Sequence, residues 1–272
     1  MTTNDIDLDA YFRRIGFRAA PRPDLATLND LARRHASAIP FENLSPLLQA
    51  GVPLDLPSIE RKLVDAGRGG YCFEQNQLFA RALEQVGFEV GFLAARVLWN
   101  RPPEVVAPRG HMLLSVQVAG EPHIVDVGFG GLTLTGSLRL QADIEQPTAH
   151  EPFRLLHADG MWRAEACVRG EWRALYAFDL QPQHAVDYEA PNYWLSTHPQ
   201  SHFVHNLLCA RALPDRRLAL LNRQFTVHRL EGGTDSRVLA SSDALIDVLQ
   251  NEFGIGGIEG IPALRSRLDA LP

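Results

Sequence analysis

RGGYCFEQN, residues 68–76, places two glycines and a tyrosine directly before Cys72, one of only three cysteines in the chain. Apolar residues recur at helical spacing after it, so a helix is predicted to begin near Cys72 and to end before Gly87. Unpaired N–H groups and the positive end of the helix dipole stabilise a thiolate there. Gly69 and Gly70 permit a sharp turn and a close approach to the backbone. The stretch is typical of a reactive cysteine, although a packed structural cysteine behind a tight turn explains it equally well.

The residues before this stretch also indicate helices. One helix is predicted behind the start signal Pro23-Asp24, and its buried face is made by apolar residues at helical spacing: Leu25, Leu28, Leu31 and Ala32. A second helix is predicted over residues 58–66. Arg68 and Glu74 flank the cysteine and are expected to form a structural ion pair that fixes the turn.

From residue 88 onward the pattern changes to short runs rich in Val, Leu and Phe, which Gly, Pro and Asn interrupt. These runs predict strands at FEVGFLAARVLWN, HMLLSVQVAG, PHIVDVGF, FRLLHA, MWRAEACV and WRALYAF. Tight turns between them favour an antiparallel meander or barrel. Two more strands are predicted over about residues 203–213 and 225–230, followed by a capped helix from Ser241 or Ser242 and a short terminal helix.

Helices that precede strands without alternating with them indicate the α+β class. We predict an N-terminal helical bundle over residues 1–87, a central antiparallel β-barrel over 88–195 and a C-terminal α/β lid over 196–272. The chain has no internal repeat and no evident flexible linker, so the three segments are expected to pack as one body.

The composition is that of an ordinary globular protein, with 272 residues, 46% hydrophobic residues and a formal charge of −6. Lys and Arg never occur more than two in a row, which argues against binding to nucleic acid. The N-terminus lacks the pattern of a signal peptide, and no apolar run approaches the roughly 20 residues that span a bilayer. A cytoplasmic protein that does not bind membranes is therefore expected.

The cysteines are odd in number and far apart, so neither a disulfide framework nor a CxxC metal knuckle is expected. Cys167 and Cys209 lie in apolar strand runs and are predicted to be core residues, with Cys209 the more deeply buried.

Three histidines have the spacing of metal ligands: His198, His202 and His205. Pro199 disfavours a helix there, and strand geometry would place His202 and His205 on opposite faces. No metal site is predicted.

A cysteine nucleophile needs a base, and His111 and Asp126 are the best candidates. His111 follows Arg109-Gly110 at the start of a predicted strand, and Asp126 lies one strand later before a glycine turn. Adjacent antiparallel strands would bring the two side chains together, so that Asp126 fixes one imidazole nitrogen and leaves the other for the thiol. Taken separately, a surface histidine and a turn-capping aspartate explain these residues equally well.

The chain closely resembles the arylamine N-acetyltransferase family in three stretches, which occur in the order RGGYCFEQN, GHMLLSV and DVGFGG. Their spacing also matches, with 39 residues from Cys72 to His111 and 15 from His111 to Asp126. The resemblance extends to IPFENLS, which starts at residue 39, and to NYWLSTHPQSHFVHN, which starts at residue 192, so it spans essentially the whole chain. It implies a helical bundle, a β-barrel and an α/β lid with a cysteine-protease-like triad. This fold agrees with the segments predicted above.

The resemblance implies that Cys72 is the nucleophile of a triad with His111 and Asp126. Acetyl-CoA, a cosubstrate rather than a permanently bound cofactor, would acylate Cys72, and an aromatic amine or hydrazine would then attack the thioester in a ping-pong cycle. Backbone N–H groups at the helix start, including that of Cys72, are the natural oxyanion donors. The chain lacks the long insertion of the vertebrate members, which indicates a bacterial type.

The resemblance also implies contacts with both substrates. The residues that match the family's aromatic acceptor pocket are Phe41, Val97, Phe129 and Phe203. A turn that could cradle the CoA pyrophosphate contains Gly128, Gly130 and Gly131. Core packing of the apolar residues and a plain glycine turn are the alternatives.

Three other functions stay open. A related amide synthase would act on a larger acyl thioester, and a cysteine hydrolase with a transglutaminase-like triad would act on a peptide amide. A protein that binds CoA or an aromatic ligand without turnover would have no need for all three triad residues. The sequence leaves open the amine acceptor and whether the chain forms a homo-oligomer.

Overall fold

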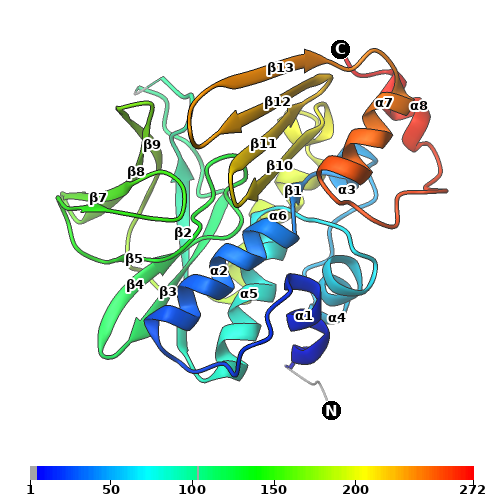
Figure 1. The fold of residues 1–272 in the computed structure, drawn as a ribbon. Coiled ribbons are helices and arrows are strands. Elements are labelled where there is room, and N and C mark those ends of the chain that lie inside the picture. Colours follow the sequence, from blue (N-terminus) through cyan, green and yellow to red (C-terminus); the bar gives the residue numbers. More distant parts are fainter. Residues whose placement is uncertain (1–4, 103) are drawn as a thin grey trace.

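The N-terminal part is helical, as predicted. The structure is a computed structural model that describes residues 5–102 and 104–272, and Figure 1 shows its arrangement. The helical segments in chain order are α1 (Leu8–Ile15), α2 (Leu25–Ala38), α3 (Leu44–Leu47), α4 (Leu56–Glu60), the π-helical turn η1 (Arg61–Asp65) and α5 (Cys72–Val86).

Local signals set the ends of these helices. Helix α2 begins behind Asp24, whose carboxylate accepts a hydrogen bond from the N–H group of Thr27. Its buried face is the predicted one except at Leu25, which is 43% exposed because it lies in the first turn, before the helix reaches the core. Helix α5 ends at Gly87, which has a φ of 105° and donates to the last carbonyls of the helix. The predicted bounds of α5 are therefore confirmed.

The helix predicted over residues 58–66 starts earlier and is not uniform. The carboxylate of Asp55 accepts from the N–H group of Ser58, so the cap lies before Leu56. The second half of this segment is the π-helical η1, which ends before Gly67.

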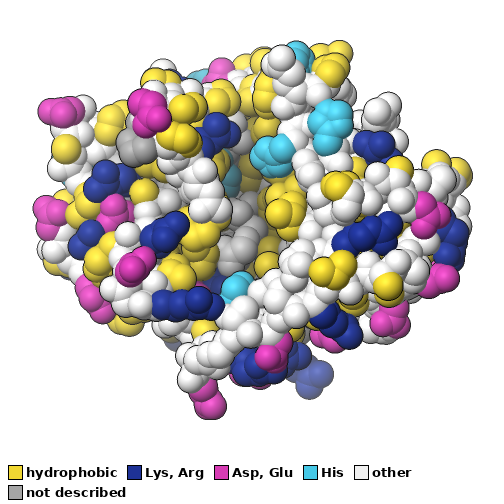
Figure 2. All heavy atoms as spheres, turned by 90° about the horizontal axis from the view of Figure 1, so that it is seen from above, with side chains coloured by type: hydrophobic (Ala, Val, Ile, Leu, Met, Phe, Trp, Pro, Cys, Tyr) yellow, Lys and Arg dark blue, Asp and Glu magenta, His cyan; other side chains and the backbone are white. Residues whose placement is uncertain are grey.

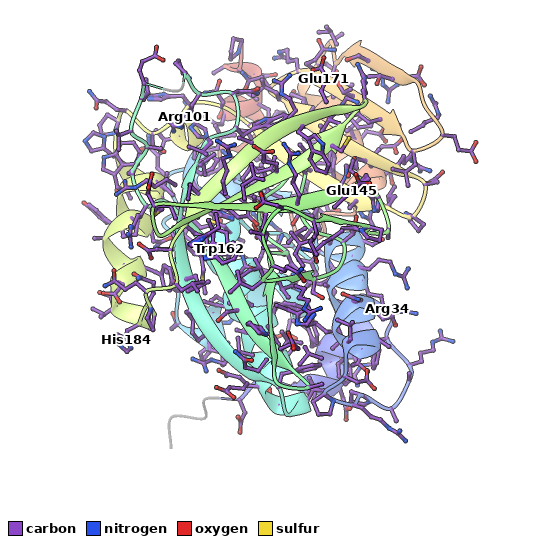
Figure 3. All side chains as sticks on the ribbon, turned by 90° about the vertical axis from the view of Figure 1, so that its left-hand side faces the viewer. Arg34, Arg101, Glu145, Trp162, Glu171 and His184 are labelled. Carbon is purple, nitrogen blue, oxygen red and sulfur yellow. The ribbon has the colours of Figure 1, made fainter. Side chains whose placement is uncertain are left out.

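The barrel is an antiparallel sheet in the order β5-β4-β3-β2-β9-β8-β7-β6. Its strands are β2 (Glu89–Val97), β3 (His111–Val118), β4 (Glu121–Val125), β5 (Leu138–Arg139), β6 (Glu145–Gln146), β7 (Phe153–Ala158), β8 (Met161–Val168) and β9 (Glu171–Phe178). A bridge between Ala142 and Leu155 nearly closes it. Figure 3 shows these strands from the side, with Trp162 on β8 and Glu171 on β9 labelled. The predicted barrel is confirmed, and α5 packs against β2 and β3.

The C-terminal part is a second antiparallel sheet covered by helices (Figure 1). Its strands are β1 (Phe41–Glu42), β10 (Leu208–Leu213), β11 (Arg216–Leu221), β12 (Gln224–Arg229) and β13 (Thr234–Val238). The helical segments here are η2 (Ala185–Tyr188), α6 (Glu189–Thr197), η3 (His202–Val204), α7 (Ser242–Asp247), the π-helical η4 (Val248–Glu252) and α8 (Leu264–Asp269). Of these elements, β1, β11, β13 and α6 were not predicted from the sequence.

The strand predicted over residues 203–213 is wrong in its first half. Phe203 lies in the short helix η3, because the hydroxyl of Ser201 accepts from the N–H group of Phe203. The side-chain amide of Asn43 donates hydrogen bonds to the carbonyls of Phe203 and Asn206, which keeps this segment out of the sheet. The domain boundaries at residues 87 and 195 stay predictions, and β1, from the helical part, is hydrogen-bonded to β10.

No helix in residues 5–102 and 104–272 is both long and apolar enough to cross a membrane.

A buried ion pair joins the second sheet to the barrel. Arg217 of β11 is 3% exposed and makes a bidentate contact with Glu151, with its Nη2 atom 2.7 Å from Oε2. The same guanidinium donates to the carbonyls of Gly131 and Thr133 in the loop after β4. These contacts fix the loop that carries the predicted CoA glycines.

Replacing Glu151 with Gln is expected to lower the free energy of unfolding by about 3–5 kcal/mol, because the Arg217 charge would stay buried without its counter-ion. Urea denaturation measures this change. The matched control is Glu121→Gln, which breaks the exposed pair of Glu121 with Arg139 and should cost less than about 1 kcal/mol. Equal losses in both variants would contradict the assigned role of the buried pair.

Candidate active site

Cys72 begins α5 behind a turn that only glycine permits. A Cβ atom added to Gly69 would lie 2.1 Å from the carbonyl oxygen of Pro40. The backbone of Gly70 is hydrogen-bonded on both sides, donating to Pro40 and accepting from Glu42. Cys72 is 5% exposed, and its Sγ atom lies 3.9 Å from the carbonyl oxygen of Gly110. The turn therefore places the thiol close to the start of β3.

The expected ion pair between Arg68 and Glu74 is absent from this part of the structure, because each residue has another partner. The Arg68 guanidinium contacts Glu42 at 2.7 Å, and Glu74 contacts Lys62 at 2.7 Å. The second oxygen of Glu74 accepts from the N–H group of Tyr71, which caps α5. Burial by itself would raise the pKa of Glu42. The charges of Arg68 and Lys62 lower it by more, so the pKa of Glu42 lies below its ordinary value. The turn is thus held by two buried pairs.

A neutral histidine supports the same turn. His35 is fully buried, with Nδ1 2.9 Å from the Tyr11 hydroxyl and Nε2 2.6 Å from Gln75 Oε1. The amide nitrogen of Gln75 lies 3.0 Å from the Pro40 carbonyl and 3.2 Å from the Gly70 carbonyl. Burial lowers the pKa of His35 to about 4. No pattern in the sequence predicted this network.

His111 and Asp126 meet as expected from two adjacent strands. His111 starts β3, Asp126 follows β4, and the two strands pair antiparallel. His111 Nε2 lies 2.7 Å from Asp126 Oδ2, and both residues are buried. Burial lowers the pKa of His111, but the charge and hydrogen bond of Asp126 and the hydrogen bond to Cys72 raise it to about 10. The structure therefore brings the three predicted residues together and favours the protonated form of His111.

The aromatic side chains predicted for the acceptor pocket lie around this group. The Phe129 ring stands edge-on to His111 at 5.4 Å between centroids. Phe41 contacts Phe203 at 6.2 Å, and Phe203 contacts the Tyr71 ring at 5.8 Å. Figure 2 shows a hollow in the centre of the upper face, with hydrophobic side chains on both sides and histidines beside it.

Val97 lies on β2 directly opposite Tyr176 of β9. The Tyr176 ring packs against His111 at 5.2 Å between centroids, so Val97 belongs to the same neighbourhood. Burial raises the pKa of Tyr176 well above normal, and the nearby Asp126 carboxylate raises it further. Tyr176 therefore stays neutral. Nothing in the sequence around Tyr176 marked it as part of the site.

Comparison with known proteins identifies the family. A family profile described as N-acetyltransferase matches residues 24–258. The chain is 44% identical over 256 residues to the arylamine N-acetyltransferase of Mycolicibacterium smegmatis, covering 92% of each chain, and 43% identical over 250 residues to that of Escherichia coli, covering 92% of this chain and 89% of the other.

This chain belongs to the arylamine N-acetyltransferase family.

Solved structures agree with this assignment. The Mycobacterium smegmatis arylamine N-acetyltransferase superposes with a TM-score of 0.94 at 42% identity, and 98% of each chain is covered. The Mycobacterium marinum arylamine N-acetyltransferase in complex with CoA gives a TM-score of 0.92 at 40% identity, with coverage of 97% of this chain and 98% of the other. The fold expected from the motif resemblance is thereby confirmed.

The three glycines after Asp126 differ in their surroundings in this family member. A Cβ atom on Gly128 would lie 2.7 Å from Cys72 Cα, and the Gly128 N–H group donates to Asp126 Oδ1 at 2.9 Å, so it is already engaged. Gly130 has a φ of 91° and faces the Phe41 ring, whereas Gly131 is exposed. Gly128 therefore packs against the helix start, and of the three predicted glycines only Gly131 is exposed.

The remaining cysteines and histidines lie outside this group. All three cysteines are free, and Cys209 is more deeply buried than Cys167, as predicted. His198 stacks on Trp194, while His205 Nε2 bonds to the Pro199 carbonyl. Across residues 5–102 and 104–272, no cluster of three or more His, Cys, Asp or Glu side chains could hold a metal ion.

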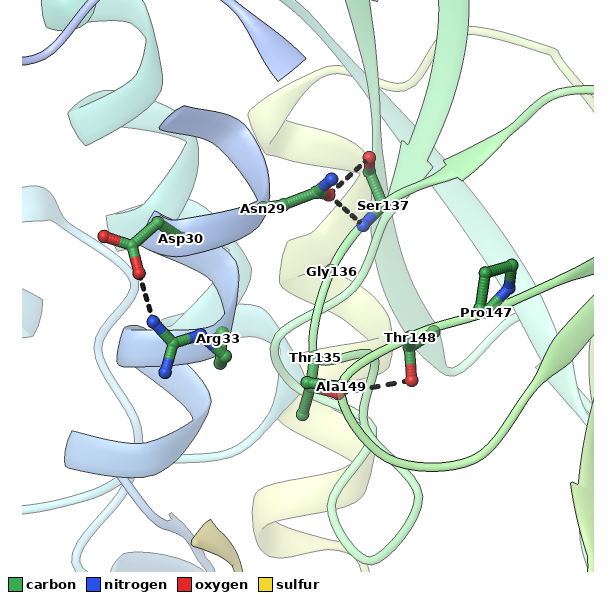
Figure 4. Close-up of a pocket in the computed structure, with 9 residues that line it drawn as sticks. All are labelled: Asn29, Asp30, Arg33, Thr135, Gly136, Ser137, Pro147, Thr148 and Ala149. Carbon is green, nitrogen blue, oxygen red and sulfur yellow. Dashed lines mark hydrogen bonds and ion pairs between the residues drawn. The ribbon is translucent and has the colours of Figure 1, made fainter. Parts of the chain in front are cut away.

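A separate pocket of about 400 Å³ lies between α2 and two barrel loops (Figure 4). Asn29 closes one wall by accepting from the N–H and hydroxyl groups of Ser137, and Asp30 pairs with Arg33 at another. None of the predicted site residues lines it.

Because folding lowers the pKa of His35 from 6.5 to about 4, the unfolded chain takes up this proton first as the pH falls. Stability is therefore expected to be lost between about pH 6.5 and pH 4, at about 1.4 kcal/mol per pH unit from this residue. Urea unfolding at several pH values measures the slope. In His35→Gln this part of the slope should vanish, and an unchanged slope would show that His35 is not the responsible group.

The three cysteines should differ sharply in reactivity. The His111 cation beside Cys72 persists at neutral pH and is lost only as the pH rises through about 10. At pH 7, iodoacetamide should therefore alkylate Cys72 at least about ten-fold faster than the half-buried Cys167. Burial raises the pKa of Cys209 well above normal, so this thiol should stay unmodified.

Peptide mass spectrometry after timed alkylation gives the three rates, with Cys167 as the internal control. In His111→Gln, the rate at Cys72 should fall to that of Cys167. Equal rates in the unmodified protein would show that no thiolate–imidazolium pair exists.

Proposed function

We propose that this protein transfers the acetyl group of acetyl-CoA to the amino nitrogen of an arylamine or arylhydrazine through an acetyl-Cys72 intermediate. The observation that carries the proposal is the buried cluster of Cys72, His111 and Asp126 at the start of α5. The names of the relatives and the CoA complex of the Mycobacterium marinum enzyme support the choice of substrates.

In the first half-reaction the Cys72 thiolate attacks the thioester carbonyl. The negative charge on the carbonyl oxygen is stabilised by backbone N–H groups in the first turn of α5, including that of Cys72, which have no partners within the helix. The bond to CoA then breaks, and the CoA sulfur takes the proton of the His111 imidazolium. Acetyl-Cys72, neutral His111 and free CoA result.

In the second half-reaction the amine attacks the acetyl-Cys72 carbonyl, and neutral His111 accepts the proton that the nitrogen loses. The C–S bond breaks, which restores the thiolate and the imidazolium and releases the amide. Asp126 holds the imidazole through Nε2, so that Nδ1 faces the sulfur.

The surroundings favour a flat aromatic acceptor. Phe41, Phe129 and Phe203 present ring edges and faces near the thiol, and the hollow in Figure 2 has apolar sides. Gly130 and Gly131 are proposed to contact the CoA pyrophosphate, because Gly131 is exposed on the same loop as Phe129.

Mixing the protein with acetyl-CoA in the absence of an amine should add one acetyl group to the intact mass. The adduct should be discharged when an arylamine such as an aminosalicylate is added, and Cys72→Ala should acquire none. This sequence of events would establish the donor, the nucleophile and the ping-pong order together.

Other outcomes would point to the rival functions. Labelling of Cys72→Ala would remove Cys72 as the nucleophile. No adduct with acetyl-CoA, but one with a larger acyl thioester, would favour an amide synthase, and tight CoA binding without any adduct would favour a binding protein. An adduct that water discharges as fast as the amine would favour a hydrolase.

A further inference from the structure

Asn76 takes no part in the reaction steps proposed above, yet it lies beside the cluster of Cys72, His111 and Asp126. It follows Cys72 by four residues on α5, so the two side chains lie on the same face of the helix. Asn76 is fully buried. Its short polar side chain must therefore find partners inside the protein.

The Asn76 amide contacts both segments that carry the base. Its Nδ2 atom donates to the Met112 carbonyl at 2.7 Å, one residue after His111. The same nitrogen donates to Asp126 Oδ1 at 3.1 Å. Its Oδ1 atom accepts from the N–H group of Val127 at 3.1 Å. The side chain thus ties α5 to β3 and to the loop after β4.

Because of these contacts, the two oxygens of the Asp126 carboxylate have different partners. Oδ2 faces His111 Nε2, whereas Oδ1 accepts from Asn76 and from the Gly128 N–H group. Two donors on Oδ1 prevent the carboxylate from rotating and leave Oδ2 for the imidazole. We infer that Asn76 is a positioning residue, which holds Asp126 in the orientation that orders His111 and fixes this pair to the helix that carries Cys72.

An amide suits this position because it donates and accepts without carrying charge. A cation here would compete with the imidazolium for Asp126, and a carboxylate would repel it. The other titratable groups that face the cluster are Tyr176 beside Asp126, and Tyr71 and Tyr188 near Cys72. Burial, with nearby negative charges, raises the pKa of all three, so they stay neutral where the test is made.

The inference rests on the proposed acetyl transfer, and two variants test it. Asn76→Ser removes the contact with Asp126, and Asn76→Asp keeps the shape but replaces the donor by a carboxyl group. The rate of Cys72 acetylation should fall roughly 10²-fold in Asn76→Ser, with KM for acetyl-CoA unchanged, because the base is misplaced while the binding surface is intact. The midpoint of the pH profile for iodoacetamide alkylation of Cys72 should move to higher pH.

Asn76→Asp gives a signature that loss of packing would not give. The introduced carboxyl group lies beside Asp126, and only its protonated form can donate to Oδ1. The ratio of the Cys72 alkylation rate in Asn76→Asp to that in Asn76→Ser should therefore rise as the pH falls. A ratio independent of pH would overturn the inference.

Asn43→Ser is the matched control. Asn43 is equally buried and makes three hydrogen bonds to backbone groups of Phe203, Asn206 and Leu208, but none to the His111–Asp126 pair. Its loss should lower the melting temperature without moving the midpoint of the alkylation profile. If both Asn76 variants behave like this control, or neither folds, Asn76 has only a structural role.

Acetylation of the unmodified protein distinguishes a failure of the inference about Asn76 from a failure of the proposed function. If it forms no acetyl-Cys72, the proposed function fails. If it does, and the Asn76 variants acetylate and titrate as it does, only the inference about Asn76 fails.

Discussion

The start of α5 is packed between two backbone segments with no room for a side chain on either side. A Cβ atom at Gly69 would overlap the Pro40 carbonyl at 2.1 Å, and one at Gly128 would lie 2.7 Å from Cys72 Cα. Backbone contacts are stiffer than contacts through rotatable side chains. The distance from the Cys72 thiol to the His111 ring is therefore set by the main chain, and the aromatic residues and charge pairs nearby are arranged around this contact.

Tight packing here requires that charges be buried, and each buried charge has its own partner. Glu42 pairs with Arg68, Glu74 pairs with Lys62, and Asp126 has His111. Within residues 5–102 and 104–272, no buried side-chain nitrogen or oxygen lacks a hydrogen-bond partner. Low local polarity strengthens each of these interactions and makes an unpaired group costly. At His111 burial by itself lowers the pKa, but the charge and hydrogen bond of Asp126 outweigh it and raise the pKa to about 10.

The sequence predicted what depends on near neighbours. Helix α5 carries its own start and stop signals, and His111 meets Asp126 because they lie on consecutive strands. Arg68 was assigned to the nearest carboxylate, but Glu74 turns back to the Tyr71 N–H group, and Arg68 finds Glu42 on the distant β1. Tyr176, Asn76 and the pairing of β1 with β10 likewise depend on contacts between distant segments. The only feature of the sequence that points to Asn76 is its helical spacing from Cys72, and an ordinary core residue would have the same spacing.

The two-residue strand β1 explains how the C-terminal sheet and the site are connected. Phe41 pairs with Ala210 of β10 on one side and forms a bridge with Gly70 on the other. Its ring contacts Phe203, and Gly130 lies against the same ring. A shift of the second sheet would therefore move the aromatic wall and the turn before Cys72 together. Because the proposed acceptor pocket and the proposed nucleophile share this backbone connection, their relative position is kept even though their residues come from distant parts of the chain.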